Sequence, residues 1–111
     1  MAANYTGKFF YPVALEFFLQ KLRGISASGL KFKYEGETEL PNGAEVKLSK
    51  DITMASWGED IKVTLTAYTN GTHVQIYSEC TFPIQEIDWG VNQGNVATLF
   101  RYFEHRMPIK K

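Results

Sequence analysis

The sequence offers few side chains that act as nucleophiles, proton donors or metal ligands. It contains one cysteine and two histidines among 111 residues, so no disulfide within the chain and no cysteine-rich zinc site can form. Cys80 lies in an alternating strand pattern that directs it to the core, where a thiol behaves as a small apolar side chain. His105 faces outward with Arg101 on a predicted helix, where solvation is the simpler role. The sequence therefore predicts no catalytic residue and no metal site.

The other histidine, His73, stands beside a hairpin turn and is predicted to face Tyr68 on the polar side of the sheet. A His–Tyr pair can exchange protons, but exposed cross-strand pairs of this kind are ordinary features of sheet surfaces. We take Tyr68 and His73 as candidate ligand-binding residues and expect no enzyme. The segment GVNQGN lacks both the glycine spacing and the lysine of phosphate-binding loops, so no cofactor is expected either.

Two tryptophan–glycine pairs are the most distinctive residues of the chain: Trp57 in MASWGED and Trp89 in EIDWGVNQGN. A tryptophan is large enough to close the end of a core between a sheet and a helix, and the glycine after it permits a sharp turn. On this structural interpretation, Asn92 or Asn95 caps the last helix. The alternative is that Trp57, Trp89 and Asn92 line a cavity that binds a small apolar ligand.

The same two motifs resemble those of small uncharacterised bacterial proteins, in which an SWGE segment starts a strand and a DWGxNxxN segment opens the C-terminal helix. The resemblance covers residues 45–106 and implies an α+β fold, and it brings no activity or cofactor. The matching positions are Ser56, Trp57, Gly58, Glu59, Asp88, Trp89, Gly90, Asn92 and Asn95.

Hydrophobic periodicity predicts the elements that must position these residues. Proline suits the first turn of a helix and glycine its C-terminal cap, and Pro108 ends the last helix. The expected elements are a strand at 5–11, a helix between Pro12 and Gly24, strands at 30–35 and 45–49, a hairpin at 59–82 and a helix at 93–107.

The hairpin is the clearest of these elements. Its Asn70–Gly71 pair predicts a two-residue turn of type I′, and a turn of that length fixes the register of the two strands. The register puts Tyr68 opposite His73, and it collects the apolar side chains of both strands on one face. That face is expected to be the core side of the sheet.

A sheet with one apolar face and two amphipathic helices predict an α+β, two-layer sandwich. We expect a single domain over residues 1–111, with four antiparallel strands, or five if 5–11 is a strand, and both helices on one face. The first helix carries Val13 and Phe17 opposite its apolar stripe, with Phe9 and Phe10 nearby. If nothing covers them, these residues form an apolar patch for another protein or for a second copy in a homodimer.

Composition narrows the function further. Twelve basic and twelve acidic residues cancel, so the chain lacks the positive field that collects nucleic acid. No segment reaches the length of a membrane span, and the lone cysteine favours the reducing cytoplasm. The sequence predicts a small soluble, non-enzymatic protein that acts through protein interaction or self-association. The alternative is a carrier that holds a small apolar ligand between helices and sheet.

Overall fold

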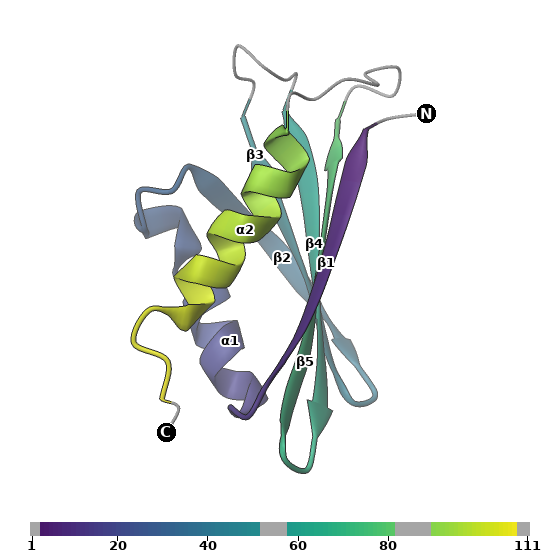
Figure 1. The fold of residues 1–111 in the computed structure, drawn as a ribbon, viewed down its shortest axis with the longest axis vertical. Helices are drawn as coiled ribbons and strands as arrows, with labels where there is room; N and C mark the ends of the chain where they lie inside the picture. The colour runs from purple at the N-terminus through teal and green to yellow at the C-terminus, as the bar shows by residue number, and fades with distance from the viewer. Residues whose placement is uncertain (1–2, 52–57, 82–89, 109–111) are drawn as a thin grey trace.

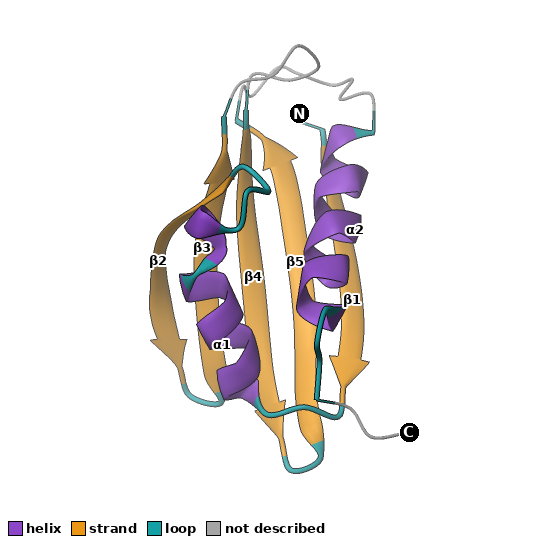
Figure 2. Ribbon diagram, turned by 90° about the vertical axis from the view of Figure 1, so that its left-hand side faces the viewer, coloured by secondary structure: helices purple, strands orange, loops and turns teal. Residues whose placement is uncertain are grey.

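One five-stranded antiparallel sheet, in the order β1-β5-β4-β3-β2, carries two helices on one face (Figures 1 and 2). The computed structural model describes residues 3–51, 58–81 and 90–108. The predicted α+β sandwich is confirmed, and residues 5–11 lie in a fifth strand. The elements are β1 (Asn4–Tyr11), α1 (Leu15–Arg23), a short 3-10 helix η1 (Ile25–Ala27), β2 (Phe32–Leu40), β3 (Gly43–Lys50), β4 (Glu59–Tyr68), β5 (Gly71–Cys80) and α2 (Val91–Glu104).

The core lies between the sheet and the helices. Helix α1 lies over the β3–β4 side of the sheet, and α2 lies over β5 and β1 (Figure 2). Every second side chain of the central strands points to this face, as alternation predicts, and each large one contributes roughly 1.5–3 kcal/mol by burial. The fully buried apolar residues of the sheet include Val46, Val63, Leu65, Val74 and Ile76.

The two helices also touch each other directly. Phe18 of α1 and Phe103 of α2 pack edge to face with ring centroids 5.3 Å apart, and both are fully buried. The Lys21 Nζ donates to the Tyr102 carbonyl at 2.5 Å, and the Tyr102 hydroxyl donates to the Lys21 carbonyl at 2.6 Å. Side chains and backbone groups of the two helices thus meet directly over the sheet. None of the described helices is long and apolar enough to cross a membrane.

The β4–β5 register differs from the predicted one by two residues. Tyr68 pairs with Gly71, so residues 69–70 form the turn, and His73 lies opposite Thr66. The predicted Tyr68–His73 pair is therefore wrong. A shift of two residues leaves every side chain on the same face, which is why the predicted core side of the hairpin is still confirmed.

Close approach of β1 explains why Gly71 belongs to the strand and not to the turn. A Cβ at this position would lie 2.2 Å from the Tyr11 carbonyl oxygen and 2.7 Å from the Phe10 ring. Only glycine lets the end of β1 pass this close to the start of β5. The sequence signal Asn–Gly was assigned to hairpin geometry, whereas the glycine serves the contact with the first strand.

The predicted apolar patch on the first helix is not present. Val13 is only 6% exposed, and its carbonyl accepts a 2.7 Å hydrogen bond from the Thr72 hydroxyl. It precedes α1, which begins at Leu15, so the helical face assigned to it does not exist. Phe17 is half-buried and packs edge to face on Phe18 at 5.4 Å. Of the residues in the predicted patch, Val13 is buried and Phe17 half-buried, whereas Phe9 and Phe10 of β1 are 55% and 39% exposed.

Helix α2 begins and ends earlier than predicted. Its N-cap is Gly90, and no side chain caps it, so the prediction that Asn92 or Asn95 is the cap is wrong. Both asparagines instead lie within the helix and are buried. The helix ends at Glu104, before the predicted residue 107.

Replacing Gly94 by alanine should stabilise the protein. Gly94 lies on the exposed side of α2, and an added Cβ would meet no atom within 4 Å. Because glycine is about 1 kcal/mol less favourable than alanine inside a helix, we expect Gly94→Ala to raise the free energy of unfolding by about that amount in urea denaturation. Gly29 also has open space, but its φ of +81° disfavours alanine. Gly29→Ala should therefore give no gain, and a loss at Gly94 would contradict the helix placement.

The edge strand β2 is tied to α1 by a charged cluster that predicts a pH effect. The Arg23 guanidinium donates to both Glu37 carboxylate oxygens at 2.9 and 2.8 Å, and the Tyr34 hydroxyl donates at 2.6 Å. These hydrogen bonds, most strongly those from Arg23, lower the pKa of Glu37 to about 2. A lowered pKa contributes stability above the ordinary value near 4.5 that is lost as the pH falls toward 2.

Carbon-13 NMR titration of the Glu37 carboxyl should report this value directly. Arg23→Gln should move the pKa of Glu37 back toward its ordinary range and flatten the loss of stability between pH 4.5 and 2. The same titration curve in both proteins would contradict the ion pair.

Candidate functional site

Residues from both sequence motifs converge in a buried polar network at one end of the sheet. Glu59, the first residue of β4, is fully buried, and Asn95 of α2 is 2% exposed. The Asn95 Nδ2 donates to Glu59 Oε1 at 2.8 Å, and the Lys50 Nζ donates to Asn95 Oδ1 at 3.0 Å. The asparagine amide thus links a buried carboxylate to an ammonium group from the neighbouring strand, β3. Such charge-assisted bonds are stronger than neutral ones.

Ser78 and Asn92 extend the network toward the first strand. The Ser78 hydroxyl donates to Asn92 Oδ1 at 2.7 Å and accepts from Asn95 Nδ2 at 3.3 Å. Asn92 Nδ2 in turn donates to the carbonyl of Ala3 at 3.0 Å. The network therefore fastens the N-terminal half of α2 to β3, β4 and β5, and to the residue that precedes β1.

Sequence reasoning did not find this network. Its signal was polar side chains at core positions: alternation places Glu59 and Ser78 on the apolar face of the hairpin, where an unpaired polar group is costly. Glu59 Oε2 has no hydrogen-bond partner among the described residues. Glu59, Ser78, Asn92 and Asn95 are buried and Lys50 is half-buried, so the network positions α2 on the sheet.

The structure does not bring the predicted ligand-binding residues into one site. Trp57 and Trp89 lie outside the described residues. Asn92 belongs to the buried network, whereas Tyr68 and His73 lie on the opposite, outer face of the sheet. The prediction for the two tryptophans stays a prediction.

The two edges of the sheet differ in a way that points to a binding surface. Edge strand β2 has a bulge between Tyr34 and Gly36, and Glu37 ties it to α1. Bulges and charges are devices that block pairing with another strand. Strand β1 pairs with β5 over eight residues without a register shift, and Lys8 is its one charged residue.

The backbone of β1 offers hydrogen-bonding groups to the open side. The Cys80 N–H donates to the Ala3 carbonyl at 2.9 Å, so the odd-numbered residues of β1 direct their backbone groups toward β5. By alternation, Thr6, Lys8 and Phe10 direct their N–H and C=O groups away from the sheet. No strand lies beyond β1 in the described part of the chain.

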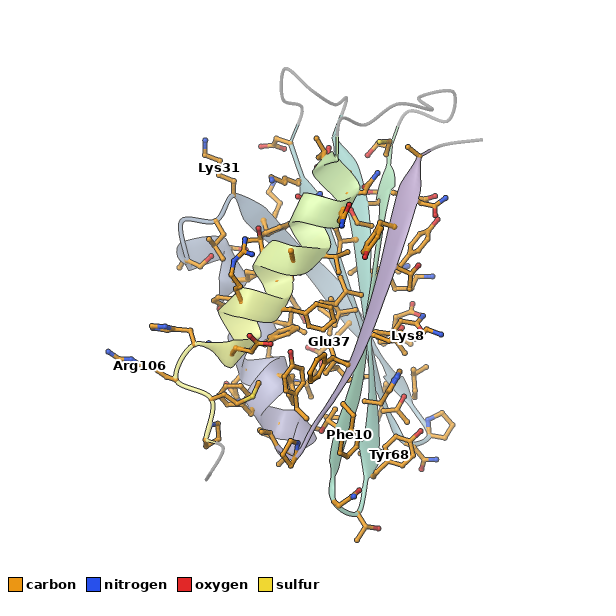
Figure 3. All side chains as sticks on the ribbon, viewed as in Figure 1. Lys8, Phe10, Lys31, Glu37, Tyr68 and Arg106 are labelled. Atoms are coloured by element: carbon orange, nitrogen blue, oxygen red, sulfur yellow. The ribbon has the colours of Figure 1, made fainter. Side chains whose placement is uncertain are left out.

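Exposed aromatic side chains lie on β1 and on the sheet surface beside it. Phe9 is 55% exposed on the helix side, where it stacks on Tyr11 with ring centroids 4.7 Å apart. Phe10 and Tyr68 form an edge-to-face pair on the outer side at 6.2 Å, and they are 39% and 57% exposed (Figure 3). Aromatic groups of this exposure on an open edge are typical of protein-binding surfaces.

A shallow groove of about 420 Å³ runs between β1 and α2, on the helix side of the sheet where Phe9 lies. Its floor is Gly7, where an added Cβ would lie 2.6 Å from Val96 and 2.9 Å from Phe100. Glycine at this position therefore brings α2 down onto β1. The groove is lined by Tyr5, Thr6, Gly7, Lys8, Gln93, Val96, Ala97 and Phe100.

Comparison with known proteins establishes the fold alone. No family model matches the chain, and no curated protein matches its sequence. Among solved structures, the crystal structure of Ara h 8.0201 is similar with a TM-score of 0.57, over 95% of this chain and 97% of that one. The two sequences are 11% identical. The chain thus has the α+β fold of that protein.

Proposed function

We propose that this chain is a protein-interaction module that binds an extended strand of polypeptide along the edge of β1. The observation that carries the proposal is the contrast between the edges: β2 is bulged and charged, whereas β1 is regular. Strand addition supplies main-chain hydrogen bonds, and alternate side chains of the added strand supply specificity.

The chemistry of the edge defines the kind of segment that fits. The added strand runs along Thr6, Lys8 and Phe10 and exchanges backbone hydrogen bonds with them. On the helix side its alternate side chains meet the groove beside Gly7 and the exposed ring of Phe9, so they are apolar or aromatic.

A synthetic peptide with the sequence of residues 4–11, NYTGKFFY, is a suitable probe because it alternates in this way. Titration into the nitrogen-15-labelled protein should shift the amide resonances of Thr6, Lys8 and Phe10. Lys8→Pro removes one outward N–H without breaking the ladder to β5, whereas Lys8→Ala keeps that N–H.

We expect the proline variant to bind the peptide about tenfold more weakly than the alanine variant. Equal binding by the two variants, or shifts confined to other surfaces, would overturn the proposal.

The second candidate, a carrier of a small apolar ligand, depends on Trp57 and Trp89. In the described part of the interior, apolar residues of both helices are fully buried, among them Phe18, Leu22, Leu99 and Phe103. No described contact favours the carrier over the interaction module.

A further inference from the structure

We infer that the strand bound at this edge is β1 of a second copy, paired antiparallel about a two-fold axis at Gly7. The inference rests on the proposed function and names its partner. It follows from three independent features of the edge: the direction of its backbone groups, the position of its one charge, and the placement of a protruding ring and a groove on opposite sides of Gly7.

The backbone restricts the registers that two β1 strands can adopt. Directly opposite residues that exchange hydrogen bonds must both be even-numbered, because Thr6, Lys8 and Phe10 carry the outward groups. Three central registers meet this condition in a two-fold pair: Thr6 opposite Thr6, Gly7 opposite Gly7, or Lys8 opposite Lys8. Within β1, the Gly7-centred register pairs residues 4–10 and the Lys8-centred register pairs residues 5–11, whereas the Thr6-centred register pairs only residues 4–8.

The charge on Lys8 selects among these registers. The Lys8-centred register places two ammonium groups directly opposite each other, which is destabilising. In the Gly7-centred register, Lys8 lies opposite Thr6 of the second copy. Both side chains are on the outer face, away from the helices, where Figure 3 shows Lys8.

The helix side of the Gly7-centred pair is self-complementary. Phe9 lies opposite Tyr5 of the second copy, in a pair whose side chains approach most closely because no backbone bonds separate them. Tyr5 is one wall of the groove, with Val96 and Ala97 beside it. Each Phe9 ring, 55% exposed in one copy, enters the groove of the other copy. Two-fold symmetry fills both grooves at once.

A pair of single-cysteine variants reads the register directly. Thr6 and Lys8 are exposed on the outer face, and Cys80, 2% exposed, is shielded from oxidation. Hydrogen-bonded cross-strand neighbours have Cα atoms about 5.5 Å apart, within the range for a disulfide. Under mild oxidation, Thr6→Cys mixed with Lys8→Cys should form a cross-linked heterodimer at least tenfold faster than either variant alone.

The other outcomes overturn the inference in distinguishable ways. Rapid cross-linking of Thr6→Cys alone, or of Lys8→Cys alone, would show a different register. If no combination cross-links and native mass spectrometry gives a monomer, the second copy is not the partner. Peptide binding at the β1 edge would then still support the proposed function. If the peptide does not bind there either, both the proposed function and this inference are overturned.

Two matched aromatic variants distinguish association through the β1 edge from non-specific hydrophobic association. Phe9 and Tyr68 are 55% and 57% exposed, but only Phe9 faces the proposed two-fold. In native mass spectrometry we expect Phe9→Glu to raise the dimer dissociation constant about tenfold or more, and Tyr68→Glu to leave it within about twofold. Equal effects of the two substitutions would contradict the interface.

Discussion

Replacing Asn95 by leucine should cost about 3 kcal/mol of unfolding free energy. The substitution removes the amide that joins Lys50 to Glu59, so the buried carboxylate loses its 2.8 Å bond and the ammonium its 3.0 Å acceptor. The remaining Glu59 oxygen already lacks a partner among the described residues. Leaving a buried charge without a partner costs more free energy than losing an ordinary hydrogen bond. The loss of stability should therefore exceed that from removing an exposed ion pair.

Urea denaturation of four variants, Asn95→Leu, Glu59→Leu, their double variant and Ser78→Ala, tests this network. Ser78→Ala removes a neutral hydroxyl from the same network and should cost about 1 kcal/mol. The double variant Glu59→Leu/Asn95→Leu should lose less than the sum of its two single variants, because no carboxylate is left unpaired. A cost under about 1 kcal/mol for Asn95→Leu would show that the network does not hold α2 on the sheet.

Replacing Gly71 by alanine should lower the free energy of unfolding by about 2 kcal/mol or more. The new Cβ would lie 2.2 Å from the Tyr11 carbonyl oxygen and 2.9 Å from the Pro12 Cα, and backbone atoms cannot rotate away as a side chain does. The end of β1 must separate from β5. The 2.7 Å bond from the Thr72 hydroxyl to Val13 is then weakened as well.

The location of the damage distinguishes this account from a disrupted turn. Amide hydrogen exchange of Gly71→Ala should rise at the C-terminal end of β1, at Phe9 and Tyr11, while β4 stays protected. Faster exchange confined to residues 68–71 would instead indicate that the glycine serves the hairpin turn.

Local sequence patterns predicted the fold correctly because the pattern within each helix and strand agrees with the face that the element buries. Alternation places Val46 and Leu48 on the core side, and the spacing of Val96, Leu99 and Phe103 predicts the buried stripe of α2. These rules depend on neighbours within one element. They therefore hold without knowledge of which strands pair.

The errors arose where distant segments meet. The Asn–Gly pair predicts a turn at Gly71, because the contact of Gly71 with Tyr11 arises only when β1 pairs with β5. Residue type alone predicts Asn92 or Asn95 as the helix cap, because Ser78 and Glu59 approach these side chains only in the folded sheet. Val13 was placed on a helix that starts two residues later.

The candidate binding edge depends on topology that the sequence does not reveal. Phe9 and Phe10 were visible as apolar residues near the first helix, but no periodicity shows that their strand ends a sheet. Strand order decides it: β1 pairs with β5, and no other described strand pairs with its second side. The function we propose follows from that order.

Amide hydrogen exchange across a range of protein concentrations tests strand addition at β1 most directly. Thr6 and Lys8 direct their N–H groups to the open edge of β1. The N–H groups of Gly7 and Phe9 point the other way and donate to β5. We predict that protection of Thr6 and Lys8 rises with concentration while that of Gly7 and Phe9 stays constant. Fast exchange of Thr6 and Lys8 at every concentration, and in the presence of the residue 4–11 peptide, would contradict the account.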